Sequence, residues 1–240
     1  MGPIGAVSPR FTARMAGLFY LLYVVLAGVA GFARRGLVVN GNAVATATNI
    51  MAHQSRYGIG FACDFLSVAS YVVVVVLFYK LLKPVNESVS MVATCFGFMG
   101  CVIMAVGGIF QLAPLLVLRQ ASISSPFSAE QLQVQAFVLL RLYTEAYSIA
   151  LLAFAFFDLI IGYLIFKSTF LPRVLGVLMS LAGLVFLTFL APEFGAKHLQ
   201  SMLPFAAGEL AVILWLLAKG VDAHQWRARC SDAAAKLHAV

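Results

Sequence analysis

Residues 134–166 read VQAFVLLRLYTEAYSIALLAFAFFDLIIGYLIF, and this stretch decides the fold. It contains no Pro, and it is longer than the roughly 20 apolar residues that a helix needs to cross the hydrocarbon core of a bilayer. Arg141, Glu145 and Asp158 nevertheless lie within it. Ionisable groups inside a span cost roughly 2.5–3.5 kcal/mol each on insertion scales, so they usually have a partner or a function. We therefore predict a central transmembrane helix with other helices arranged around its polar face.

The composition of the whole chain is that of a membrane protein. Hydrophobic residues make up 62% and charged residues 10%, whereas soluble domains average about 25% charged residues. The formal charge of +7 comes from basic residues scattered at the edges of apolar runs, so no stripe for a nucleic acid exists. The four cysteines form no CxxC pair, and no histidine lies well inside an apolar run. The sequence therefore predicts neither a cofactor nor a metal site.

The apolar runs predict an all-α, polytopic bundle of six transmembrane helices, which cover 15–32, 57–82, 88–118, 134–166, 174–191 and 199–218. Residues 43–56 predict a seventh, short helix that is interfacial or re-entrant, with Val44, Ala47, Ile50 and Met51 on one face. The expected organisation is a leader at 1–14, a single transmembrane domain at 15–219 and a basic tail at 220–240.

Six spans place both termini on the same side of the membrane. Ten of the 16 Lys and Arg residues lie on that side, five lie on the opposite side, and Arg141 lies in a span. Because Lys and Arg accumulate on the cytoplasmic side, both termini are predicted to be cytoplasmic.

Two carboxyl groups in other predicted spans are the leading site candidates. At about 1.5 Å per residue, Glu209 lies near the bilayer centre and Asp64 lies roughly 10 Å below the outer surface. Both are candidates for acid and base chemistry or for proton coupling. An outer group of Gln111, Arg141, Tyr143, Glu145 and Tyr147 is predicted to bind the substrate with them.

The predicted helix 134–166 has polar residues on two different faces. Arg141 and Glu145 are four residues apart, so they share a face and are predicted to pair, either as the rim of a pocket or as a structural ion pair. Asp158 points elsewhere and is predicted to pack against another helix.

Several segments resemble one family of bacterial multi-pass membrane proteins. They are ARMAGLFYLL (13–22), YKLLKPV (79–85), GYLIFKSTFLPRVLGVL (162–178) and GELAVILWLLAKGV (208–221). The family is catalogued as a domain of unknown function, number forty-three eighty-six. The resemblance implies a bacterial inner (cytoplasmic) membrane protein of six or seven helices and no specific activity. Asp64, Pro172, Arg173 and Glu209 match its pattern, whereas Asp158 stands where an uncharged residue is expected.

Three functions are compatible with these features. The leading hypothesis is an outward-facing intramembrane pocket that binds a small or lipophilic substrate, with proton coupling at Glu209. The second is a membrane-embedded enzyme in which Asp64 and Glu209 are general acid and base on an isoprenoid or lipid-like substrate, as in terpene cyclases. The third is a scaffolding subunit that binds a membrane protein partner or a second copy of the chain. The lipid bilayer is the surrounding partner in each case.

Overall fold

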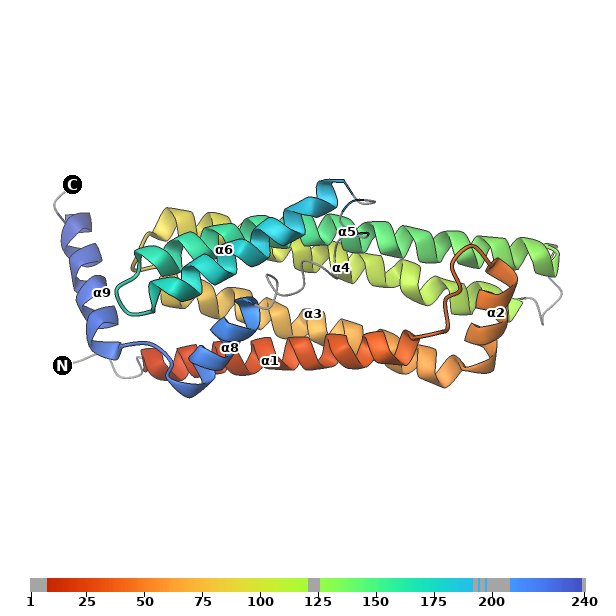
Figure 1. The fold of residues 1–240 in the computed structure, drawn as a ribbon, viewed down its shortest axis with the longest axis horizontal. Helices are drawn as coiled ribbons and strands as arrows, with labels where there is room; N and C mark the ends of the chain where they lie inside the picture. Colours follow the sequence, from red (N-terminus) through yellow and green to blue (C-terminus); the bar gives the residue numbers. More distant parts are fainter. Residues whose placement is uncertain (1–7, 121–125, 192–193, 195–196, 198–207, 239–240) are drawn as a thin grey trace. The chain divides into compact units, whose positions relative to one another are not determined.

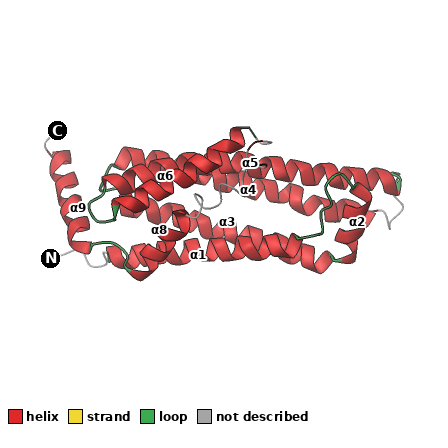
Figure 2. Ribbon diagram, viewed as in Figure 1, coloured by secondary structure: helices red, strands yellow, loops and turns green. Residues whose placement is uncertain are grey.

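The computed structural model describes residues 8–120, 126–191, 194, 197 and 208–238. Every regular element within these ranges is helical, which confirms the all-α prediction (Figures 1 and 2). The helices are α1 (Pro9–Arg34), α2 (Ala43–Ala52), α3 (Gln54–Leu82), α4 (Glu87–Gln120), α5 (Ala129–Lys167), α6 (Arg173–Leu187), a 3₁₀ turn η1 (Thr188–Leu190), α8 (Gly208–Ala218) and α9 (Ala223–His238).

Five of the described segments are long and apolar enough to cross a membrane. They are α1, α3, α4, α5 and the run Arg173–Leu190, which joins α6 to η1. Because a lipid environment requires each span to satisfy its own backbone hydrogen bonds, such helices indicate a multi-pass membrane protein. The sixth predicted span differs: its described part, α8, has 11 residues, and residues 198–207 lie outside the described ranges.

Several predicted boundaries differ from the structure, and the central helix begins at Ala129 rather than at residue 134. The first helix begins at Pro9 rather than at residue 15. The predicted helix 43–56 ends at Ala52, and Gln54 begins α3. The buried face of α2 consists of Thr46, Ala47 and Ile50, while the predicted face residue Val44 is 56% exposed.

The contacts divide the chain into two compact units. Unit 1 comprises 1–21, 70–100 and 151–240, and unit 2 comprises 22–69 and 101–150. Helices α1, α3, α4 and α5 contribute residues to both.

Unit 1 is built around aromatic side chains and close backbone contacts. Tyr71 packs edge-on against Tyr20 and Phe154, with ring centroids 5.5 Å and 4.8 Å apart. Helices α5 and α6 approach at two glycines: a Cβ on Gly162 would lie only 2.6 Å from the carbonyl oxygen of Gly176. Small residues at such positions let helices pack through their backbones.

Helix α9 closes the ends of two long helices within unit 1. The indole N–H of Trp226 donates to the carbonyl of Leu81 in the last turn of α3, at 2.9 Å. The guanidinium of Arg229 donates to the carbonyl of Lys167, the last residue of α5, at 3.2 Å. These carbonyls have no partner within their own helices, so α9 supplies it.

Unit 2 buries a cluster of apolar side chains from four helices and from the connection between α1 and α2. It consists of Leu37, Ala47, Ile50, Tyr57, Leu115, Leu118, Ala136 and Leu140. The connection from α1 turns at Gly36, whose φ of 79° suits a residue without a Cβ. Asn42 then caps α2 by accepting a hydrogen bond from the amide of Ala45 at 2.9 Å.

Candidate functional site

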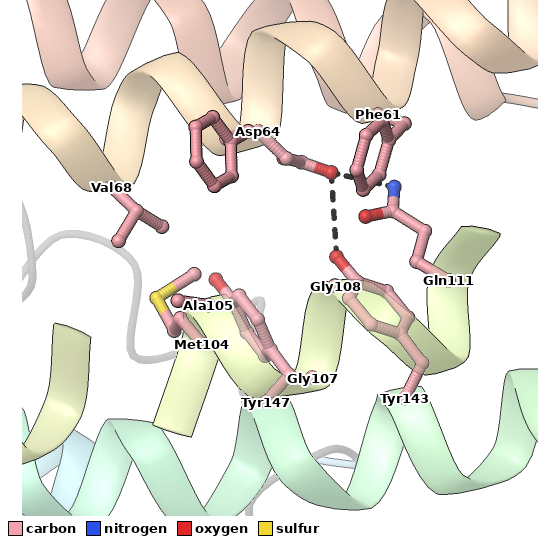
Figure 3. A pocket seen from close by; sticks show the side chains of 11 residues that line it. Phe61, Asp64, Val68, Met104, Ala105, Gly107, Gly108, Gln111, Tyr143 and Tyr147 are labelled. Atoms are coloured by element: carbon pink, nitrogen blue, oxygen red, sulfur yellow. Dashed lines mark hydrogen bonds between the residues drawn. The ribbon is translucent and has the colours of Figure 1, made fainter. Parts of the chain in front are cut away.

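Asp64 is the centre of a polar network in unit 2. Its Oδ2 atom pairs with Nη1 of Arg34 and accepts hydrogen bonds from Nε2 of Gln111 at 2.8 Å and from the hydroxyl of Tyr143 at 3.4 Å. The four side chains come from α1, α3, α4 and α5. Figure 3 shows Gln111 and Tyr143 converging on the carboxylate. Three of these residues, Asp64, Gln111 and Tyr143, belong to the predicted site, and the structure joins them by hydrogen bonds.

Arg34 is the member of the network that sequence reasoning missed. The first predicted span ends at residue 32, two residues before Arg34, and Arg34 was not among the predicted site residues. In the structure its guanidinium lies 5.7 Å from the ring centroid of Tyr143 while it binds Asp64. One signal in the sequence could have suggested the pair: Asp64 has no obvious partner in its own span, and Arg34 lies at the end of the preceding span.

The first of the cavities that Asp64 lines is small. The cleft drawn in Figure 3 has a cavity volume of about 20 Å³, which is room for about one water molecule. Tyr147 and Gln111 line it, together with Phe61, Phe65, Val68, Met104, Ala105, Gly107, Gly108 and Tyr143.

Two larger cavities lie beside this network in unit 2. The first has a volume of about 280 Å³ and is lined by Tyr23, Ala27, Gly31, Arg34, Asp64, Ser67, Met104, Tyr143, Thr144 and Tyr147. The second has a volume of about 400 Å³ and is lined by Gly31, Arg34, Arg35, Val38, Asn40, Gln111, Phe137, Leu140, Arg141, Tyr143 and Thr144. They share Gly31, Arg34, Tyr143 and Thr144, so they adjoin. We call the two together the Arg34 groove. Its volume is in the range of small-molecule sites.

The predicted Arg141–Glu145 ion pair is not formed. The ion pairs among the described residues are Arg34–Asp64 and Lys83–Glu87. Arg141 is exposed and lies over the ring of Phe137, 5.5 Å from its centroid. It lines the Arg34 groove, whereas the exposed Glu145 lines none of the three cavities. The spacing put both residues on one face, but the neighbouring ring was the better partner for the cation.

Glu209 has different partners from Asp64. In unit 1 its Oε2 accepts a hydrogen bond from the buried hydroxyl of Tyr20 at 2.7 Å, and its carboxyl group lies within hydrogen-bonding reach of Asp158. Asp158 was predicted to pack against another helix, and it is fully buried. Sequence reasoning did not foresee that the residue it meets there is Glu209, nor that Tyr20 joins them.

The Asp158–Glu209 pair has no cation beside it within the described ranges. Both carboxyl oxygens of Asp158 lack a hydrogen-bond donor among the described residues. Burying an unpaired carboxylate costs several kcal/mol, so this is an unusual arrangement to retain. Simple packing does not explain why the Asp158–Glu209 pair is retained.

A family profile described as "Domain of unknown function (DUF4386)" matches residues 15–220. The chain belongs to this family. No curated protein and no solved structure matches it. Two of the segments that resemble DUF4386 proteins contain glycines at close backbone contacts of unit 1. Gly162 and Gly176 lie between α5 and α6. A Cβ on Gly208 would lie 2.8 Å from the carbonyl carbon of Leu178. Helix α8 packs against α6 at this last contact.

Proposed function

We propose that this DUF4386 protein binds a small lipophilic molecule in the Arg34 groove. The observation that carries the proposal is the Arg34–Asp64 pair, which lines a cavity of about 280 Å³ between segments of α1, α3, α4 and α5. The side chains of Arg34 and Asp64 are 21% and 15% exposed, so the pair is neither sealed in a core nor free at a surface. Charges retained inside membrane spans are functional candidates by default.

The proposed setting is a bacterial inner membrane, with six spans, both termini in the cytoplasm and the groove open toward the outside. The excess of Lys and Arg near the termini supports this orientation. In it, α8 belongs to the sixth span. The groove then meets a ligand that arrives from the outer leaflet.

We further propose that the Asp158–Glu209 pair carries a proton. A proton held between the two carboxyl groups gives Asp158 the hydrogen bond that the described residues do not supply. The Tyr20 hydroxyl donates to Oε2 of Glu209 at the same time. A hydrophobic carbodiimide, which reacts with protonated carboxyl groups in apolar surroundings, should modify Glu209 or Asp158 and leave the exposed Glu145 unmodified. Equal modification of Glu145 would contradict this reasoning.

The binding proposal is tested by filling the groove. Ala27 lines the smaller cavity from α1, so Ala27→Trp should occupy the space of the ligand. Val25 lies on the same helix, is 51% exposed and lines none of the cavities, so Val25→Trp is the matched control.

Native mass spectrometry of gently extracted protein is the measurement. Wild type and Val25→Trp should retain a lipophilic molecule that Ala27→Trp has lost. If all three proteins carry the same bound species, or if none carries any, the groove is not the binding site.

A further inference from the structure

The Arg34 groove is asymmetric in charge. All charged residues lining its larger cavity are arginines, namely Arg34, Arg35 and Arg141. Asp64 already neutralises Arg34. Arg35 and Arg141 are exposed and have no carboxylate partner among the described residues. Two arginines without a carboxylate partner among the described residues therefore line one cavity.

The backbone around this cavity is prepared for an anion. The carbonyls at the C-terminal end of a helix carry partial negative charge and would repel one. Here the guanidinium of Arg56 donates to the carbonyls of Phe32 and Arg35 at the end of α1, at 3.0 Å and 2.8 Å. That contact neutralises the nearest backbone acceptors and adds a third positive charge close to Arg35.

The adjoining smaller cavity has different walls. Apart from Asp64 and Arg34, which neutralise one another, it is lined mainly by aromatic and aliphatic groups, among them Tyr23, Ala27, Met104 and Tyr147. A ligand that fills both cavities would place its apolar part against these side chains. Its charged end would then lie at Arg35 and Arg141, where the planar fork of arginine suits two oxygens of a carboxylate or phosphate.

We propose that the ligand is an amphiphile with one anionic head, a phosphate or a carboxylate, on an apolar body. This rests on the proposed function, because it names the ligand class of the same groove. Arg35 and Arg141 bind the head, and the segments of α1, α4 and α5 around Ala27, Met104 and Tyr147 enclose the body.

The experiment measures the thermal stability of the full chain in phosphatidylcholine nanodiscs with added dodecyl phosphate. Dodecanol supplies the same tail without charge, and inorganic phosphate supplies the head without a tail. A ligand that binds only the folded state raises the melting temperature in a concentration-dependent way. Dodecyl phosphate should do so at concentrations where the other two compounds have no effect.

Arginine substitutions assign the head site. Because each arginine is proposed to make charge-assisted hydrogen bonds to the head, Arg141→Gln should weaken binding of dodecyl phosphate about tenfold, and Arg35→Gln with Arg141→Gln about a hundredfold. The control is Arg14→Gln, since Arg14 is an exposed arginine of α1 that lines none of these cavities. It should bind like wild type.

The outcomes separate the ligand class from its source. An unchanged affinity in the double variant overturns the inference, and so does an equal shift with dodecanol or with inorganic phosphate. If dodecanol binds as well and Ala27→Trp blocks it, the proposed function stands and only the anionic head is wrong. Nanodiscs of phosphatidylglycerol identify the source of the ligand. If the ligand is a bilayer lipid, wild type is already stabilised in these discs and added dodecyl phosphate has no further effect. If the ligand is a free amphiphile, dodecyl phosphate still raises the melting temperature there.

Discussion

Removing the positive charge of Arg34 alone should lower the free energy of unfolding as much as removing both charges of the Arg34–Asp64 pair. In Arg34→Leu the carboxylate of Asp64 keeps only the Gln111 bond at 2.8 Å and the long Tyr143 bond at 3.4 Å. Breaking a fully buried pair costs about 3–5 kcal/mol. Because the two side chains are 21% and 15% exposed, the lower end, about 3 kcal/mol, is expected.

The reverse substitution should cost less. In Asp64→Leu the guanidinium of Arg34 still lies over the ring of Tyr143, and a cation over an aromatic ring retains part of its stabilisation. A cost of about 2 kcal/mol is therefore expected. The double variant leaves no charge unpaired and should cost about 3 kcal/mol in lost packing and hydrogen bonds, so the coupling free energy is about 2 kcal/mol.

The assay is equilibrium unfolding in mixed micelles with increasing dodecyl sulfate, followed by tryptophan fluorescence. The exposed Lys83–Glu87 pair, 2.8 Å apart, supplies a control cycle with Lys83→Gln and Glu87→Gln, for which no measurable coupling is expected. If the Arg34 and Asp64 substitutions are additive, as in the control cycle, the pair contributes nothing specific and the reasoning about the groove fails at its first step.

Three further outcomes are expected. Gly162→Ala should destabilise the protein by at least about 2 kcal/mol in the same unfolding assay, because its Cβ would meet the backbone of α6, whereas Gly28→Ala, which meets nothing within 4 Å, should stabilise it by up to about 1 kcal/mol; equal effects would contradict the close contact. Asp158→Leu should lower stability by about 1 kcal/mol in the same assay, because it removes the hydrogen bond that the shared proton is proposed to make with Glu209, and a gain in stability would contradict the shared proton. Partial burial raises the pKa of the Cys230 thiol, and the thiolate is the form that reacts with alkylating agents. In a variant whose only cysteine is Cys230, alkylation should therefore reach half its maximal rate at a higher pH than alkylation of glutathione.

The spans were predictable from the sequence because one property, apolar length, decides them. The run Val72–Val76 would favour a strand in a soluble protein, yet it lies in the middle of α3, since a lipid environment requires each segment to satisfy its own hydrogen bonds. The break at His53 was not predictable in this way. At His53, the C-cap of α2, φ is −127° and ψ is 43°, and Ile50 and Tyr57 on either side of this break are both buried in the unit 2 cluster.

The site was predicted in part, for a related reason. Depth estimates grouped Asp64, Gln111 and Tyr143, because residues at similar depths on neighbouring helices can meet. Depth does not reveal angular position, so Arg34 was left out of that group, whereas Glu145 and Glu209 were included in it. The meeting of Asp158 and Glu209 likewise depends on how α5 and α8 pack in unit 1, which periodicity along one helix cannot supply.

The contacts of α9 impose an order on the biosynthesis of the protein. The carbonyls of Leu81 and Lys167 receive their last hydrogen bonds from Trp226 and Arg229. Leu81 and its donor are separated by 145 residues, so at about 5–20 residues per second the ribosome needs on the order of ten seconds to supply it. During that interval the last carbonyls of α3 have only water or lipid headgroups as hydrogen-bond partners.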